Sequence, residues 1–208
     1  MGIAVVPHEG PANVMIMTAA HLVGSPHAAL GAPALLQPAG PDGGRMSRDL
    51  VGRPFRTAWN LPSSQGEGDA VLVTLESGLE IDLSYPQIGS LRGHCTVVRE
   101  GWTVCKAARS SGLVEGRIVS TAWSGFVDYS WGRRWLSRQV LIEGTGRVAL
   151  AGDSGSVWVT PSGYAVALSF SATDAAGRFS IATPLDRLLD AFSVRVAVAS
   201  AASPVASG

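Results

Sequence analysis

The chain has few charged residues and no long apolar segment. Asp, Glu, Lys and Arg make up 15% of its 208 residues, and the formal charges cancel. No cluster of basic residues could follow a phosphate backbone, so we expect no nucleic-acid partner. No apolar run approaches the ~20 residues of a membrane helix, so we expect no membrane partner. The N-terminal residues show no basic segment followed by an apolar core, which predicts a cytoplasmic protein or a mature form whose leader has been removed.

The sequence has only two cysteines, Cys95 and Cys105. Neither lies in a glycine-rich turn, so a cysteine nucleophile is not expected. Zinc binding with His94 would lack a fourth ligand, and adjacent residues of a strand point to opposite faces. We therefore expect no metal or cofactor and two buried thiols. A hairpin with its turn near residues 100–101 would instead let the two thiols form a disulfide.

No histidine follows Ser154, and this absence limits the ways in which that serine could be activated. Ser154 lies in the segment Gly-Asp-Ser-Gly-Ser at 152–156, which forms an ordinary turn or one that exposes a hydroxyl and aims N–H groups at one point. The usual base for a serine hydroxyl is a histidine held by a carboxylate. An order with the histidine last is excluded, and the order acid, histidine, serine leaves only His94 as the base. The order histidine, aspartate, serine fits the sequence easily.

His21 is the candidate base. It closes the apolar run 14–20, as a strand does when it delivers a polar side chain into a cleft at its end. A histidine bonded to a carbonyl at a strand end would show the same pattern. Asp69 is the candidate acid, because it opens the apolar run 70–75 and a buried carboxylate needs a partner such as imidazole. The other aspartates considered are expected to face solvent, one of them from an alternating strand at 79–83: Asp42, Asp49, Asp82 and Asp128.

Glycine, proline and short apolar runs dominate the rest of the chain. With 25 glycines and 12 prolines, turn residues separate the apolar runs in a pattern typical of all-β sandwiches or barrel pairs. Four strands are expected in the second half: 117–120, 139–142, 156–159 and 165–168. One helix is expected from Pro184 to Phe192, where apolar residues share one face. The only basic and aromatic patch, 131–135, is interpreted as a loop or hairpin whose arginine stems lie over tryptophan.

Three short motifs together resemble the trypsin/chymotrypsin-like serine peptidases. They are Thr-Ala-Ala-His at 18–21, Asp-Ala-Val-Leu at 69–72 and Gly-Asp-Ser-Gly-Ser at 152–156. The segment 106–116 also resembles the divergent bacterial and plant branch that includes the rice narrow-leaf protein, where relatives tend to show Lys-x-Gly-Arg-Thr-Thr-Gly. The resemblance covers roughly residues 3–195.

The resemblance implies an all-β fold of two packed six-stranded antiparallel Greek-key barrels with a short C-terminal helix. The first barrel, residues 1–90, would carry the histidine and the aspartate. The second, residues 91–196, would carry the serine and the helix, and residues 197–208 would form a flexible tail. Only twenty residues precede His21, enough for a hairpin of residues 2–6 and 14–17. This predicts a first barrel that lacks a strand, or a chain that is part of a longer protein.

The resemblance also implies a role for each site residue. His21 would be the general base, Asp69 its orienting carboxylate and Ser154 the nucleophile, while the N–H groups of Gly152 and Ser154 would form the oxyanion hole. The residue six before the nucleophile lies at the base of the specificity pocket in the family, and here it is Val148. An apolar base offers no partner to lysine or arginine. The pocket walls would come from three further residues and their neighbour Ala172: Ser169, Phe170 and Ser171.

The predicted function is therefore a serine endopeptidase that hydrolyses peptide or protein substrates of non-basic specificity through an acyl-enzyme. An esterase with the same triad, or a non-catalytic peptide-binding or scaffold module on a peptidase fold, remain the alternatives. Many relatives mature by freeing an N-terminus that pairs with the carboxylate at the position of Asp153. The residues Met1-Gly2-Ile3 show no sign of such a processing site.

Overall fold

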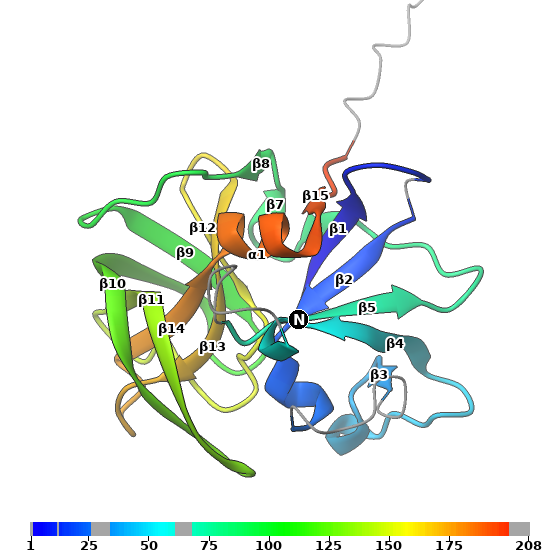
Figure 1. Ribbon diagram of the computed structural model, residues 1–208, viewed down its shortest axis with the longest axis horizontal. Coiled ribbons are helices and arrows are strands. Elements are labelled where there is room, and N and C mark those ends of the chain that lie inside the picture. Colours follow the sequence, from blue (N-terminus) through cyan, green and yellow to red (C-terminus); the bar gives the residue numbers. More distant parts are fainter. Residues whose placement is uncertain (1, 12, 26–33, 61–67, 200–208) are drawn as a thin grey trace, which may run out of the picture.

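The computed structural model describes residues 2–11, 13–25, 34–60 and 68–199. In this part of the chain, two large β-sheets lie side by side, and one α-helix, α1 (Leu185–Phe192), lies near their junction (Figure 1). Contacts of α1 with strands of both sheets explain its amphipathic sequence. No helix among the described residues has the length and apolar character needed to cross a bilayer.

The first sheet has six strands in the order β15-β1-β2-β5-β4-β3. Their bounds are β1 (Ile3–Pro7), β2 (Met15–Thr18), β3 (Leu35–Leu36), β4 (Leu50–Thr57), β5 (Val71–Leu75) and β15 (Val194–Val196). The pairing of Ala4 with Ile16 confirms the expected N-terminal hairpin. The sixth strand, β15, follows α1 and pairs with β1, Val5 lying opposite Val196. The domain boundaries expected from the sequence place these residues in the second barrel. They instead form a strand of the first sheet, which pairs with the edge of β1, and the side chains of Val194 and Val196 are buried in the core.

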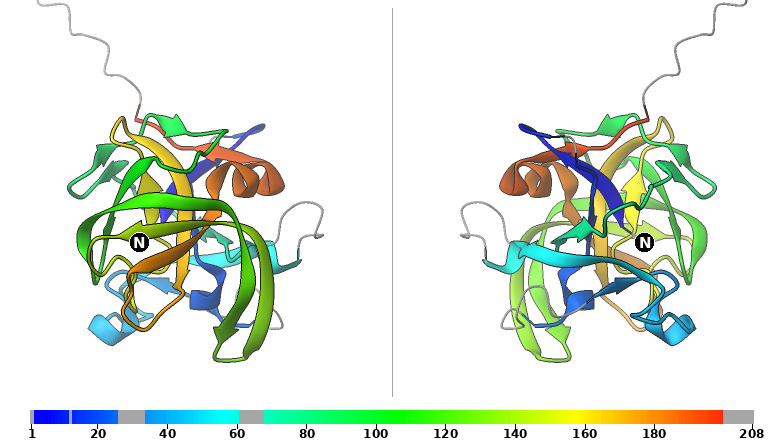
Figure 2. Two further views of the ribbon diagram at one scale, coloured as in Figure 1. Left: turned by 90° about the vertical axis from the view of Figure 1, so that its left-hand side faces the viewer. Right: turned by 90° about the vertical axis from the view of Figure 1, so that its right-hand side faces the viewer.

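The second sheet closes on itself through six antiparallel strands, and β8 joins it as a parallel seventh. The bounds are β8 (Gly93–His94), β9 (Thr103–Ala108), β10 (Gly112–Tyr129), β11 (Gly132–Gly144), β12 (Val157–Val159), β13 (Tyr164–Ala172) and β14 (Phe179–Pro184). The four strands expected in this half are confirmed, and so is the helix. Figure 2 shows the long β10–β11 hairpin curving past the body of the barrel. The all-β double-barrel architecture with a C-terminal helix is the one expected.

Short elements connect these sheets. They are the 3₁₀ turns η1 (Ala20–Val23), η2 (Gly40–Asp42) and η3 (Ala58–Asn60) and the small hairpin of β6 (Ser84–Tyr85) and β7 (Gly89–Ser90). The strand predicted at 79–83 is wrong, because these residues form a loop without regular secondary structure. The expectation that Asp82 faces solvent holds, since its exposed carboxylate accepts the N–H of Ser84 at 2.8 Å.

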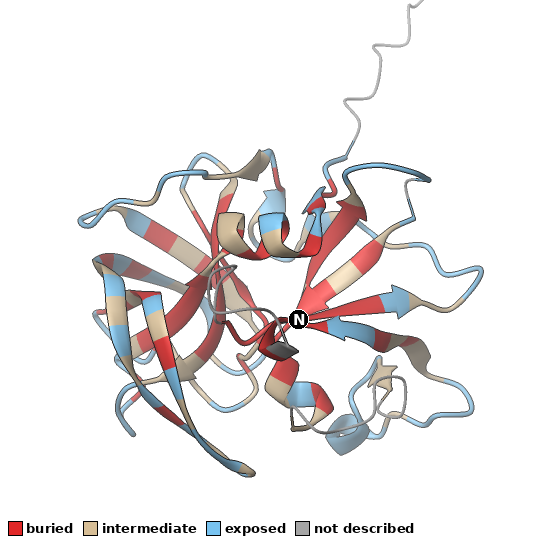
Figure 3. Ribbon diagram, in the orientation of Figure 1, coloured by how far each residue is buried: buried red, intermediate tan, exposed pale blue. Residues whose placement is uncertain are grey.

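Buried residues gather at the junction of the two sheets and inside the second barrel (Figure 3), and two apolar clusters lie there. The larger contains Met17 and Leu72 from the first sheet, Leu168 from the second and Leu188 from α1, so it joins the two sheets. The other surrounds the fully buried Trp158 inside the second barrel. Burying a side chain of this size stabilises the fold by about 1.5–3 kcal/mol. The junction between the sheets is therefore a packed core, and residues contributed from either side are held in fixed positions.

The two cysteines are free thiols, and the register of the second sheet explains why. Cys105 lies opposite Val159, which lies opposite Ala165, and Ala165 pairs with the residue before Cys95. Three strand spacings of about 4.8 Å separate the two thiols, whereas a disulfide needs Cα atoms closer than about 7 Å. The alternative of a disulfide is therefore wrong. Both thiols are partly rather than fully buried, and burial raises the pKa of each.

Candidate active site

The first sheet brings His21 and Asp69 together. His21 lies on η1, directly after β2, and Asp69 lies two residues before β5; β2 and β5 are paired neighbours, Thr18 opposite Val71. The His21 backbone N–H donates to Asp69 Oδ1 at 3.0 Å, and the distance from His21 Nδ1 to Asp69 Oδ2 is 2.6 Å. The carboxylate is fully buried. It therefore holds both the backbone and the ring of the histidine.

Ser154 reaches the same imidazole from the second sheet. It lies in the loop that leads into β12, and its Oγ is 2.9 Å from His21 Nε2. A proton on Nδ1 satisfies the carboxylate and leaves Nε2 as an acceptor for the serine hydroxyl. The Ser154 Oγ also lies 3.4 Å from the carbonyl oxygen of Phe170. The three residues singled out in the sequence thus meet in one hydrogen-bonded chain across the junction of the sheets.

The loop carrying Ser154 is organised by the buried carboxylate of Asp153. Oδ1 accepts the N–H groups of Ser110 and Ser111, both at 3.0 Å, and Oδ2 accepts that of Leu150 at 3.0 Å. The ammonium of Lys106 lies 3.5 Å from Oδ2. Burial acts to raise the pKa of Asp153, but these hydrogen bonds and the charge of Lys106 outweigh it and lower the pKa. The carboxylate therefore stays charged and fixes residues 150–154 against the β9–β10 turn.

Lys106 is the only lysine in the chain, and its side chain is fully buried on β9. The ammonium lies 5.2 Å from the centre of the Trp158 ring, on its face. Burial lowers the pKa of Lys106 to about 8, although the Asp153 carboxylate acts to raise it. Sequence reasoning missed this residue as part of the site. The signal was a single lysine inside a short strand whose other residues are uncharged, Thr-Val-Cys before it and Ala-Ala after it.

Gly152 has a backbone conformation that requires glycine. Its φ is +97°, and a Cβ atom there would lie 2.6 Å from Ser110 Oγ. Within the described residues, the N–H groups of Gly152 and Ser154 donate to no protein acceptor, whereas Gly155 donates to Ser169 O at 2.8 Å. The two remaining donors belong to one turn beside the serine hydroxyl. Two N–H groups in this position could donate hydrogen bonds to the negative oxygen that forms when the serine attacks a carbonyl group.

Ser156 is the second residue after Ser154, and its hydroxyl has a local partner. Ser156 Oγ donates to the carbonyl oxygen of Asp153 at 2.6 Å, and the Ser156 N–H donates to the same oxygen at 3.0 Å. Both groups are buried. Ser156 therefore stabilises the turn through the backbone of Asp153, while the Asp153 carboxylate binds other N–H groups.

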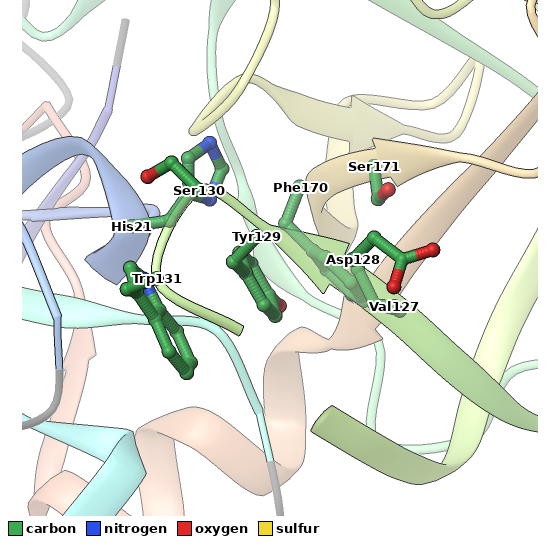
Figure 4. Close-up of a pocket in the computed structure, with 8 residues that line it drawn as sticks. All are labelled: His21, Val127, Asp128, Tyr129, Ser130, Trp131, Phe170 and Ser171. Carbon is green, nitrogen blue, oxygen red and sulfur yellow. The ribbon is translucent and has the colours of Figure 1, made fainter. Parts of the chain in front are cut away.

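A cavity of about 290 Å³ lies beside the imidazole (Figure 4). Its walls are His21, Val127, Asp128, Tyr129, Ser130, Trp131, Phe170 and Ser171. Two of the expected pocket residues, Phe170 and Ser171, line it. Val148 is instead packed in the core around Trp158, and the buried Ser169 Oγ bonds Ser180 Oγ at 3.0 Å.

The hairpin tip that forms one wall of this cavity was not predicted to be near the site. The sequence suggested arginine stems over tryptophan at 131–135, but Arg133 lies over the ring of Phe126 at 5.8 Å and pairs with Asp128. Tyr129 contacts the His21 ring, with 5.8 Å between ring centres. No local pattern indicated this contact, because it depends on the length of the β10–β11 hairpin.

No family model matches the chain, and a search of curated proteins finds no match. Solved structures do match its fold. A glutamic-acid-specific serine protease gives a TM-score of 0.62 at 18% identity, covering 94% of this chain and 98% of that one. Protease A of Thermobifida fusca gives 0.63 at 18% (96% and 91%), and a chymotrypsin of Cellulomonas bogoriensis gives 0.64 at 19% (96% and 90%). The chain has the fold of the trypsin/chymotrypsin-like serine proteases.

Proposed function

We propose that the protein is a serine endopeptidase that acts through an acyl-enzyme. The observation that carries this proposal is the hydrogen-bonded chain from Asp69 through His21 to Ser154, with heavy-atom distances of 2.6 and 2.9 Å. Such distances are within the reach needed for a base to take a proton from a nucleophile. The shared fold supports a peptidase over other serine hydrolases, although the same three groups would also cleave activated esters.

In the proposed first half-reaction, the Ser154 oxygen attacks the carbonyl carbon of the scissile peptide bond, and its proton passes to His21 Nε2. The imidazolium is stabilised by the Asp69 carboxylate, which keeps its charge and holds the ring in position. The carbonyl π electrons move to the oxygen, which becomes an oxyanion. The N–H groups of Gly152 and Ser154 then donate to this oxygen.

Collapse of the tetrahedral intermediate breaks the carbon–nitrogen bond. His21 gives its proton to the leaving amine, and an ester to Ser154 remains. In the second half-reaction a water molecule loses a proton to His21 and attacks the ester carbon. The acid is released when the Ser154 oxygen recovers the proton, so the enzyme returns to its starting state.

The specificity we propose is for non-basic side chains. Val127, Tyr129 and Phe170 give the cavity beside His21 apolar walls. Its one acid, Asp128, is already bound by both ends of the Arg133 guanidinium, at 2.6 and 3.2 Å. A basic substrate side chain would have to compete with this pair. An apolar side chain would gain about 25 cal/mol for each Å² that it buries.

Labelling with a fluorophosphonate probe tests the proposal, because only an activated serine forms the covalent phosphonyl adduct. We expect one adduct per chain on Ser154, abolished by Ser154→Ala and by His21→Ala. Each change removes a group whose loss costs on the order of a millionfold in kcat in the triad of subtilisin, which has the same chemistry on another fold. Ser162→Ala, on an exposed turn, is the matched control and should label normally.

Correct folding of each variant is checked by circular dichroism. Absence of labelling in the folded natural sequence would contradict a catalytic role and favour a peptide-binding module. A third outcome is that Ser154 is labelled and ester substrates are cleaved, but no peptide in a combinatorial library is cleaved. This outcome would favour an esterase over a peptidase.

A further inference from the structure

The tip of the β10–β11 hairpin extends from the second sheet to the first, next to the imidazole. Tyr129 ends β10 and pairs with Gly132, so Ser130 and Trp131 form the turn between the strands. Arg134, at the start of β11, donates through Nη2 to the backbone oxygen of Trp59 at 3.2 Å. This bond fastens the hairpin to η3, which follows β4 of the first sheet.

Aromatic contacts fix the direction of the Tyr129 side chain. Its ring stacks on that of Trp131, with 4.8 Å between centres and an angle of 5° between planes. The ring of Trp59 meets it nearly edge-on at 6.0 Å, and the imidazole of His21 lies at 5.8 Å (Figure 4). Stacked and edge-on pairs are preferred arrangements of aromatic rings. The phenol therefore has one well-defined place beside the histidine.

The phenol oxygen lies close to the carboxylate that holds His21. It is buried and, within the described residues, makes no hydrogen bond of ordinary geometry. Burial raises the pKa of Tyr129 far above its usual value, the nearby Asp69 carboxylate raises it further, and Arg134 opposes both. The hydroxyl therefore keeps its proton. Each Asp69 oxygen accepts one bond from His21, which leaves lone pairs for another donor.

We propose that Tyr129 is a positioning residue for the His21–Asp69 pair: its phenol donates to the Asp69 carboxylate, and its ring confines the imidazole. This role rests on the proposed function and adds to it a residue of the second sheet that acts on two residues of the first. A donor to Asp69 spreads the negative charge of the carboxylate, which reduces the stabilisation of imidazolium. The other charged groups near the phenol are Arg134 and the exposed pair of Asp128 and Arg133, which cancel each other.

Tyr129→Phe tests the proposal, because it removes the hydroxyl and keeps the ring. Without the donor, Asp69 should hold the imidazolium more strongly, so the pKa of His21 should rise by about half a unit to one unit. We expect kcat to fall on the order of tenfold with KM nearly unchanged, because a carboxylate that has lost this donor orients the ring less exactly for proton transfer, and this loss outweighs the stronger hold on the imidazolium. Tyr164→Phe, on β13, is the matched control and should change neither quantity.

The pKa of His21 is read by NMR titration of its ring, which needs no catalysis. If the protein fails to react with the fluorophosphonate probe, the proposed peptidase activity is refuted, but the titration still tests the role of Tyr129. In an Asp69→Asn background, Tyr129→Phe should no longer shift the His21 titration, because the acceptor has lost its charge. An unchanged titration and a kcat within twofold of normal in Tyr129→Phe overturn the proposal. If that variant misfolds, the exchange rate of the Tyr129 hydroxyl proton with water is measured by NMR in the unaltered protein. Slow exchange supports the hydrogen bond to Asp69, and rapid exchange refutes it.

Discussion

Raising the pH through about 8 should weaken the loop that carries Ser154, because Lys106 then loses its charge. The ammonium is fully buried, and burial lowers its pKa to about 8 against the opposing effect of Asp153. Deprotonation removes the cation that faces the Asp153 carboxylate, which keeps its three backbone N–H donors. The carboxylate is then a buried charge without a counter-ion, and the turn of the oxyanion donors depends on it. We expect kcat/KM, or the rate of probe labelling, to fall across this pH.

The stability of the fold should change in the opposite direction. The lysine pKa falls from 10.5 to about 8 on folding, which corresponds to about 3 kcal/mol. Between these two pH values the unfolded chain binds more protons than the folded one, so this group makes the free energy of unfolding rise with pH. Below pH 8 the cost of burying the ammonium is fully present. A gain in stability together with a loss of activity is therefore the signature of Lys106.

The single lysine makes the assay direct. Lysine labelled with ¹³C at Cε gives one NMR signal, whose titration we expect near pH 8. Lys106→Arg keeps a positive charge at all these pH values, so it should lose both the alkaline fall in labelling and the rise in the free energy of unfolding, measured in urea. The reasoning would be refuted if the lysine signal titrates near pH 10.5, or if the labelling rate of Lys106→Arg falls at alkaline pH as it does in the unaltered protein.

Two further changes test the site. Asp69→Asn should leave the fold intact but slow labelling of Ser154 by about 10⁴-fold at neutral pH, since the amide favours the wrong imidazole tautomer; labelling within tenfold of normal contradicts the role of Asp69. Gly152→Ala should destabilise the protein by about 1–3 kcal/mol in urea and abolish labelling, because its φ is positive and Ser110 Oγ occupies the space. Gly146→Ala, where a Cβ meets nothing within 4 Å, is its control, and equal effects of the two substitutions would contradict this explanation.

The candidate triad could be predicted because its signals are local or depend on chain order. His21 follows one apolar run and Asp69 precedes another. The absence of a histidine after Ser154 restricts the order in which the base, the acid and the nucleophile can occur along the chain. Apolar periodicity likewise predicted α1, whose buried side chains share one face. The strand expected at 79–83 is absent although its sequence alternates, because no neighbouring strand in the described structure pairs with it.

The rest could not be predicted because it depends on contacts between distant segments. Tyr129 reaches His21 only because β10 and β11 extend far beyond the barrel, and no local pattern records that length as a contact. Lys106 becomes a partner of Asp153 only when β9 lies under the nucleophile loop. Val148 was predicted at the base of the specificity pocket by counting six residues back from Ser154, but its side chain packs in the core around Trp158.

The pairing of β15 with β1 has a consequence for synthesis on the ribosome. One edge of the N-terminal sheet stays open until Val194–Val196 has emerged, because β1 ends at Pro7 and β15 begins only at Val194. Closing a loop of that length carries a substantial entropic cost, which slows the last step of assembly. Because α1 and β15 also cover the core shared by both sheets, a nascent chain cannot complete that core early. We expect the edge of β1 to stay available for pairing with other chains until β15 docks.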